Sequence, residues 1–371
     1  MFIISRAKKV VVNKISNYRY NRAQSRAVHE YFDNIADSSL PELTSAEKNE
    51  IINKWRGIIP NPRIGFHAYR IFKKFREFDS SYIPEPFFYP YIIRRLNPTQ
   101  DYISLPNKCL NDALFCDLNR PKTIFRKSGS NIISGDFLSI DFDEAVELAL
   151  KQKSDLIIKP AKDTNSGRGV KLINSTACRS DIVALLSEYN SDFIVQKRVE
   201  QSAFTAQFNP TSLNTIRAVT LFINSRISLC YAILKLGSAG RIVDNGANGG
   251  LWVGIQSDGT LNSWGTDFKC NFSKSHNGIS FDSIETPLPS FDKIKELAFN
   301  AHMRIPMCGL VAWDIALDTN NNPLLIEANL WWPATSYGEI CSGPAFGDRT
   351  SEVIEYLKEQ QLSKVGLLNT I

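Results

Sequence analysis

The sequence predicts an α+β protein with a helical N-terminal region and antiparallel sheets beyond it. Three observations predict this class: helical spacing in the first 60 residues, short strands alternating with helices over 105–199, and long strands joined by tight turns from 215 onward. The 371 residues suffice for two or three units with their own cores, and the apolar fraction of 43% is that of a soluble globular protein.

The first 60 or so residues are predicted to be mainly helical, with helices over 27–36 and 45–56. Thr44 or Ser45 caps the second helix, and Pro60 and Pro62 follow its end. Three prolines (Pro84, Pro86 and Pro90) exclude a long helix in the aromatic stretch over 63–100, which is typical of a packed surface between two units. His67 in this stretch is interpreted as structural.

The formal net charge is +5, and basic residues concentrate at the start of the chain. A basic helix lying on a membrane surface is one interpretation; a helix packed on the body is favoured. Nucleic acid is not expected as a partner, because the basic stretch lacks interleaved aromatic platforms. Seven scattered cysteines without a CxxC pair favour a reducing compartment, and no apolar run is long enough to span a membrane. We therefore expect a cytoplasmic protein, with peripheral contact to the inner membrane face left open.

From residue 105 the pattern alternates between helices and strands. Helices are predicted over 108–118, 141–152 (capped by Asp141) and 180–189, and strands over 121–125, 155–160, 170–173 and 193–199. Two hairpins follow, 215–223 with 226–236 across Asn224-Ser225, and 251–255 with 260–264. Helices over 292–304 and 350–359 complete the prediction.

The segment Leu310 to Asn329 is predicted to be a hairpin with Asp314 opposite Glu327. One face is predicted to be apolar, formed by Val311, Trp313, Ile315, Leu317, Leu324, Ile326 and Ala328. The other face carries Asp314, Glu327 and Asn329.

Two carboxylates opposite each other repel, so a chain keeps such a pair if one is protonated or if a cation lies between them. Aspartate, glutamate and asparagine offer only oxygen ligands, which suit Mg²⁺ together with phosphate. The hairpin therefore indicates a magnesium–phosphate site; the alternative is a solvated strand face with an incidental acid pair.

A second signal is the loop between the strands 155–160 and 170–173. Lys159 ends the first strand, and Ser166, Gly167 and Gly169 follow in a polar loop that can approach phosphate oxygens. The loop leads into a strand, so it is not a Walker A loop. It is either a flap that closes over phosphates or an ordinary hairpin loop.

Two further basic residues indicate an anionic partner or ligand. Arg217 lies on a predicted buried strand and needs a carboxylate or phosphate partner. Lys108, in the PNKCL segment, is a weaker signal. Three separate segments thus indicate one ligand, a magnesium-complexed polyphosphate.

The chain resembles the ATP-grasp enzymes, and most closely their sugar-transfer-associated branch. The motifs that carry the resemblance are PNK (106–108), IIKPAKDTNSGRGV (157–170), FIVQKRV (193–199), SLNTIRAVT (212–220), DNGANGG (244–250), AWDIAL (312–317) and LLIEAN (324–329). The resemblance implies two α+β subdomains that grip ATP between antiparallel sheets. The implied units are an N-terminal region over 1–100, a lid over 101–195 and a C-terminal subdomain over 196–371.

The resemblance also implies roles for individual residues. Those that would bind the nucleotide are Lys108, Lys159, Ser166, Gly167, Gly169, Gln196, Lys197, Val199 and Glu200. Asp314, Glu327 and Asn329 would hold Mg²⁺, Arg217 would contact the transferred phosphate, and Asn245 would line the acceptor site. The chain carries Gln196 and Lys197 where many members carry glutamate.

The implied reaction joins a carboxylate to an amine with ATP, through an acyl phosphate. The acceptor implied by the branch is a sugar acid or amino sugar in bacterial surface-polysaccharide synthesis. Two alternatives stay open, a kinase that phosphorylates a hydroxyl and a nucleotide-binding module without turnover.

Overall fold

The computed structural model describes residues 39–98, 102–162, 168–189, 191–238 and 250–360. The helix predicted over 27–36, the basic N-terminal stretch, Ser166, Gly167 and Asn245 lie outside these residues, so what was expected of them stays a prediction. Within the described ranges, no helix is long and apolar enough to cross a membrane.

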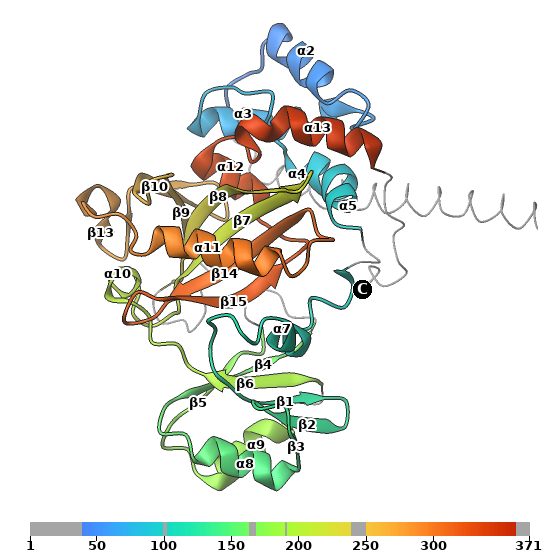
Figure 1. Ribbon diagram of the computed structural model, residues 1–371. Coiled ribbons are helices and arrows are strands. Elements are labelled where there is room, and N and C mark those ends of the chain that lie inside the picture. The colour runs from blue at the N-terminus through green and yellow to red at the C-terminus, as the bar shows by residue number, and fades with distance from the viewer. Residues whose placement is uncertain (1–38, 99–101, 163–167, 190, 239–249, 361–371) are drawn as a thin grey trace, which may run out of the picture.

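Two antiparallel sheets form the body of the protein (Figure 1). The six-stranded sheet has the order β3-β2-β1-β6-β4-β5. Its strands are β1 (Thr123–Ser128), β2 (Asn131–Ser134), β3 (Ser139–Ile140), β4 (Leu156–Pro160), β5 (Lys171–Ile173) and β6 (Phe193–Lys197). We call this sheet with its helices α8 (Phe142–Leu150) and α9 (Arg179–Ser187) the lid. Asp141 caps α8 as predicted, by accepting from the Glu144 N–H.

The seven-stranded sheet has the order β11-β10-β9-β8-β7-β14-β15. Its strands are β7 (Thr215–Ile223), β8 (Arg226–Leu236), β9 (Leu251–Ile255), β10 (Leu261–Asp267), β11 (Phe272–Ser273), β14 (Leu310–Leu317) and β15 (Pro323–Asn329). A small ribbon of β12 (Ser275–His276) and β13 (Ile279–Ser280) lies apart, and α10 (Ala203–Ala206) precedes β7. The predicted turn between β7 and β8 is confirmed, with positive φ at Asn224 (51°) and Ser225 (57°).

Helices cover both faces of the large sheet. On one face α11 (Phe291–His302) packs against β7, β14 and β15. On the other lie α12 (Thr335–Ser342), α13 (Thr350–Glu359) and the N-terminal helices (Figure 1). These N-terminal helices are α2 (Ser45–Lys54), α3 (Phe66–Phe75), α4 (Glu85–Phe87), the π-helix η2 (Phe88–Ile92) and α5 (Ile93–Leu96). Short 3₁₀ turns are η1 (Pro62–Gly65), just before α3, and η4 (Phe281–Ser283) and η5 (Gly347–Arg349) later in the chain. Helix α12 was not predicted.

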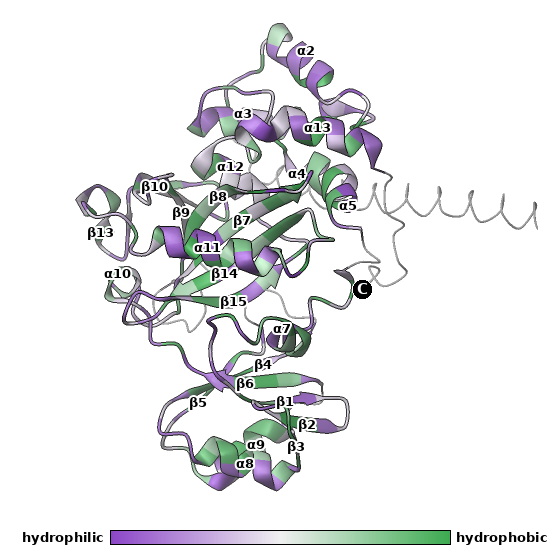
Figure 2. Ribbon diagram, in the orientation of Figure 1, coloured by the Kyte–Doolittle hydropathy of each residue, from purple (hydrophilic) through white to green (hydrophobic). Residues whose placement is uncertain are grey.

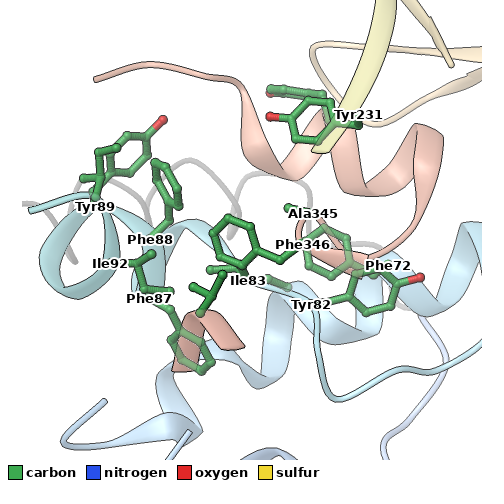
Figure 3. Packing of buried hydrophobic residues seen from close by; sticks show 14 of the residues in the cluster. Phe72, Tyr82, Ile83, Phe87, Phe88, Tyr89, Ile92, Tyr231, Ala345 and Phe346 are labelled. Carbon is green, nitrogen blue, oxygen red and sulfur yellow. The ribbon is translucent and has the colours of Figure 1, made fainter. Parts of the chain in front are cut away.

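The aromatic stretch predicted to be a packed surface is indeed core. Phe72, Tyr82, Phe87 and Phe88 are buried together with residues of the large sheet and of α12 and α13 (Figure 3). The prolines break this stretch into short helices, as expected. In Figure 2 hydrophobic residues run along the strands, and hydrophilic ones mark the outer faces of α2 and α3.

Helix α7 (Lys108–Leu114) lies between the two sheets and contacts β1, β6 and β15. After it, the Phe115 ring meets Trp313 edge-on at 5.7 Å between centroids. Asn119 then pairs with β15, accepting from the Leu325 N–H at 2.9 Å. The segment around α7 therefore joins the lid to the edge of the large sheet.

One detail of the hairpin prediction is wrong. A bulge between Asp314 and Ile315 places Leu325, rather than Leu324 or Ile326, opposite Ile315. Leu325 is consequently the residue that enters the core, and Leu324 and Ile326 are only partly buried. Asp314 still lies opposite Glu327, as predicted.

Candidate active site

A row of charged side chains crosses the large sheet at one level. Asp314 on β14 is paired in register with Arg217 on β7 and with Glu327 on β15. The Arg217 Nε and Nη2 donate to the two carboxylate oxygens of Asp314, both at 2.8 Å. Lys235 on β8 donates to Asp314 Oδ2 at 3.1 Å, and the Asn329 amide donates to the same oxygen at 3.2 Å.

This row is not a solvated strand face, because Asp314 is 6% exposed and β14 is buried throughout. Burial alone would raise the pKa of Asp314, but the charges of Arg217 and Lys235 outweigh it and hold the pKa well below its usual range. Asp314 is therefore an ionised carboxylate held by two cations.

The second carboxylate is paired with a different base. Lys108, the first residue of α7, has its Nζ 3.1 Å from Glu327 Oε1. Asn107 fixes the start of this helix, because its side chain accepts from the Cys109 N–H at 2.9 Å. The Lys108 N–H donates to the Ala161 carbonyl at 2.8 Å, which places α7 next to the end of β4.

Lys159, on β4, lies close to Lys108 and Glu327. Burial lowers its pKa to about 8, and the nearby charges of Lys108 and Arg120 act in the same direction, while Glu327 opposes them. The Lys159 ammonium therefore loses its proton at a lower pH than an ordinary lysine does.

A narrow pocket lies where the lid meets β15. It is lined by Lys108, Asn111, Asp112, Phe115, Arg120, Lys159, Ile194, Gln196, Leu325, Ile326, Glu327 and Ala328. The structure thus brings together Lys108, Lys159, Gln196 and Glu327, four of the residues proposed from sequence for one nucleotide site. Arg217, Asp314 and Asn329 lie beside them on the sheet.

The predicted adenine hinge lies at the end of β6. The Gln196 side chain is buried and donates to Thr123 Oγ1 at 3.1 Å. β6 ends at Lys197, whose N–H donates to the Lys122 carbonyl at 2.9 Å, and Val199 and Glu200 follow in irregular backbone.

Of the predicted phosphate loop, the structure describes Gly169. Its φ is +75°, and a Cβ there would lie 2.8 Å from the ring of Pro160, so glycine is required for two reasons. The Tyr189 hydroxyl donates to the Gly169 carbonyl at 2.6 Å. The end of the loop is thereby held against the residue that follows Lys159.

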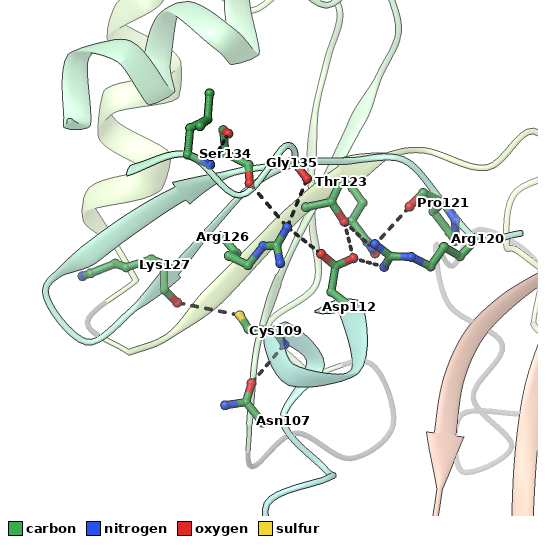
Figure 4. Close-up of polar contacts among 12 residues, drawn as sticks. Asn107, Cys109, Asp112, Arg120, Pro121, Thr123, Arg126, Lys127, Ser134 and Gly135 are labelled. Carbon is green, nitrogen blue, oxygen red and sulfur yellow. Dashed lines mark hydrogen bonds and ion pairs between the residues drawn. The ribbon is translucent and has the colours of Figure 1, made fainter. Parts of the chain in front are cut away.

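Sequence reasoning missed a buried cluster beneath the pocket (Figure 4). Asp112 is 2% exposed and accepts from the Thr123 hydroxyl at 2.5 Å and from Arg120. Arg126 approaches the same carboxylate at 2.9 Å, and burial lowers the pKa of Arg120 to about 10. The network ties α7 to β1 and holds Arg120 at the pocket wall.

Lys235 was also missed, although the sequence carried a signal. It is the one charged residue in the apolar run Ile227 to Leu236, and a buried lysine needs an anionic partner. The partner is Asp314, on a strand 79 residues away.

His302 is structural, as predicted. Its Nε2 lies 2.7 Å from the Cys308 carbonyl and its Nδ1 lies 2.7 Å from the Thr220 hydroxyl. A carbonyl only accepts, so Nε2 carries the proton and Nδ1 accepts. Burial lowers the pKa of His302 to about 4, and the neutral ring has no free nitrogen for catalysis.

The residues predicted to hold magnesium fit a hard cation. Asp314 and Glu327 face each other on two paired strands, Asn329 lies two residues beyond Glu327, and all three can supply oxygen ligands. Among the described residues no group of three histidine, cysteine, aspartate or glutamate side chains could hold a metal. The remaining positions around such an ion would therefore fall to the asparagine, to water and to phosphate oxygens.

The chain is similar to one protein family and to several solved structures. The model of the sugar-transfer associated ATP-grasp family matches residues 90–354. No curated protein matches the chain. Similar solved structures include D-cycloserine synthetase DcsG (14% identity over 71% of this chain and 73% of that chain, TM-score 0.44) and the VanG D-Ala:D-Ser ligase of Enterococcus faecalis (13%, 71% and 63%, 0.43). A D-alanine–D-alanine ligase of Bacillus anthracis matches at 12% identity over 68% of each chain, with a TM-score of 0.39.

Proposed function

The chain belongs to the sugar-transfer associated ATP-grasp family, and we propose that it is an ADP-forming ligase that joins a carboxylate to an amine. Its fold is the predicted one, an ATP-grasp fold of two α+β units with antiparallel sheets and a helical N-terminal region. The substrates we propose are an amino acid and a sugar acid or amino sugar, in surface-polysaccharide synthesis.

One observation supports this proposal above the others. Four basic side chains, Lys108, Lys159, Arg217 and Lys235, converge from both sheets and from α7 on Asp314 and Glu327. The neighbouring Asp112 is already paired with two further bases, Arg120 and Arg126. An excess of positive charge in a partly buried site favours a polyanion, and Mg-ATP supplies one.

In this proposal Lys108 and Lys159 bind the phosphates of ATP in the pocket between the lid and β15. Lys108 leaves Glu327 when it turns to a phosphate, so binding exposes a carboxylate at the place where a metal ion is needed. Residues 196–200 lie at the end of β6 and would contact the adenosine.

Asp314, Glu327 and Asn329 would hold Mg²⁺, which neutralises charge on the transferring phosphoryl group when it is bound. Arg217 and Lys235 already lie against Asp314, and their positive charges would favour the acyl phosphate. The protein's contribution is therefore positioning and charge neutralisation, with no covalent enzyme intermediate.

The reaction balances without a further reactant. A carboxylate oxygen attacks the γ-phosphorus and ADP leaves with the bridging oxygen. The amine nitrogen then attacks the acyl carbon, inorganic phosphate leaves, and the nitrogen loses a proton to form the amide.

The test measures phosphate release from Mg-ATP with a panel of amino acids crossed with uronic acids and amino sugars, using Asp314→Ala as the blank. Release that requires two co-substrates and is lost in the variant is the expected result. ADP formed without free phosphate, with the phosphate on the acceptor, would instead identify a kinase. ATP binding without turnover across the panel would contradict the ligase proposal for these substrates.

A second variant tests the metal site. Glu327→Ala should abolish magnesium-dependent turnover, since it removes the carboxylate that Lys108 is proposed to release. Mg-nucleotide binding and turnover that survive this change would contradict the assignment.

A further inference from the structure

The loop that follows β15 is held in place by three of its backbone carbonyls. Asn97 donates to the Leu330 carbonyl at 2.7 Å, Arg217 Nη1 to the Trp332 carbonyl at 3.3 Å, and the Tyr231 hydroxyl to the Pro333 carbonyl at 3.0 Å. Three donors from separate parts of the chain thus fix the backbone path of this loop.

Trp332 nevertheless keeps 48% of its surface exposed. It is the only tryptophan among the large apolar side chains that are exposed in the described ranges. One side of it packs on Tyr89, with 4.5 Å between ring centroids, and Tyr89 itself is 2% exposed. Figure 3 shows Tyr89 at the end of the N-terminal aromatic core. One side of the indole therefore packs on Tyr89, and the other side is accessible to solvent.

A single exposed aromatic residue is common on protein surfaces, so only the position of Trp332 suggests a function. The guanidinium that bonds the Trp332 carbonyl is the same one that holds Asp314. The nucleotide pocket lies toward Glu327 at the edge of the sheet, whereas Arg217 lies two strands further in. The backbone of Trp332 thus borders the place where Arg217 and Lys235 lie, and the proposed reaction needs a place for its second substrate beside the nucleotide.

We propose that the open face of Trp332 is a stacking platform for a pyranose ring of the acceptor, with Tyr89 as its support. The carbon-bearing face of a pyranose is flat and apolar, which matches an indole, and its polar substituents would point toward Arg217 and Lys235. This inference rests on the proposed ligase function and names its acceptor class as a cyclic sugar.

Fluorine NMR tests the platform without turnover. Protein labelled with 5-fluorotryptophan has six such positions, and Trp332→Phe identifies the resonance of Trp332. The probes are methyl glucuronide, methyl galacturonide and methyl glucosaminide, with gluconate as an acyclic control and a non-hydrolysable ATP analogue with Mg²⁺. We expect at least one pyranoside to shift this resonance, and gluconate and the nucleotide to leave it unchanged.

The result that overturns the proposal is a Trp332 resonance that no pyranoside shifts, or that gluconate or the nucleotide shifts equally. Benzyl alcohol is a further probe, because an equal shift with it would indicate an aromatic occupant instead of a sugar. Since binding is observed directly, these outcomes are separate from a failure of the ligase reaction itself.

Kinetics give a second readout with the best acceptor found. Trp332→Ala should raise the KM for the pyranoside roughly tenfold and leave the KM for ATP unchanged, while Trp332→Phe keeps most of the stacking. Phe272→Ala is the matched control, an equally exposed aromatic residue (51%) on β11 at the opposite edge of the same sheet. Equal effects of the Trp332→Ala and Phe272→Ala changes would contradict a platform at Trp332.

Discussion

Raising the pH above about 8 should weaken ATP binding through Lys159. In the ligand-free protein burial holds the pKa of this lysine at about 8, below its ordinary value of 10.5. A bound polyphosphate favours the ammonium form, so the complex keeps the proton to a higher pH and binding takes up a proton above pH 8. Because each pH unit above the lowered pKa costs up to tenfold in affinity, ATP should bind about tenfold more weakly at pH 9 than at pH 7.

Isothermal titration calorimetry from pH 7 to 9.5, in buffers of different ionisation enthalpy, measures both the affinity and the proton uptake. The terminal phosphate of ATP is already deprotonated above pH 8, so it contributes little to the change. Lys159→Met should bind more weakly throughout and lose the dependence above pH 8. Lys171→Met, which changes an exposed lysine on the neighbouring strand, should retain it. An affinity that stays flat from pH 7.5 to 9.5 in the unaltered protein would refute the reasoning.

Three predictions concern stability, each measured by urea unfolding. Asp314→Ala leaves two buried bases without their carboxylate and should cost about 3–5 kcal/mol, whereas a loss below about 1 kcal/mol would mean that the bases find another partner. Asn97→Ala removes hydrogen bonds to buried backbone groups of Leu310 and Leu330 and should cost about 3 kcal/mol; an unchanged midpoint would show that water replaces the amide. Burial raises the pKa of Glu339 to about 8, so the native state holds a proton that the unfolded state loses from about pH 4.5. Stability should therefore fall as the pH rises from about 5 to 8, and Glu339→Gln should flatten this fall; a slope that Glu339→Gln leaves unchanged would exclude this residue as its cause.

The sequence predicted best where local chemistry decides the structure. Asp318 to Pro323 forms the turn between β14 and β15, and Asp318 accepts from the Asn320 and Asn322 N–H groups. The turn pairs Leu317 with Pro323, and the bulge then shifts the register by one residue, which brings Asp314 opposite Glu327. The same reasoning located the hairpin at Asn224-Ser225.

The bulge at β15 could not be predicted, because strict alternation is the simplest pattern that such a short sequence supports. Leu324, Leu325 and Ile326 are all apolar, so hydrophobicity alone does not say which of them enters the core. In the structure the Leu325 N–H also donates to the Asn119 carbonyl, a long-range contact that local patterning does not reveal.

Long-range pairing also explains what was missed in the site. Asp112 sits in a short helix whose sequence shows an ordinary polar residue, and only the fold brings Arg120 and Arg126 to it. Lys235 stood out as a charge in an apolar strand, but its partner on β14 depends on the order of strands in the sheet.

The structure stabilises the two opposed carboxylates in a way that the sequence analysis did not anticipate. A pair such as Asp314 and Glu327 was expected to survive only if one acid were protonated or a cation lay between them. The structure uses separate bases instead: Arg217 and Lys235 hold Asp314 from one side, and Lys108 holds Glu327 from the other. The two pairs differ in strength, because Asp314 is buried and bonded by several donors, whereas the Glu327 side chain is 33% exposed and has one ion pair within the described part of the chain. A polyphosphate should therefore displace the Lys108 pair first and leave Asp314 in place, which makes Glu327 the carboxylate that binding releases.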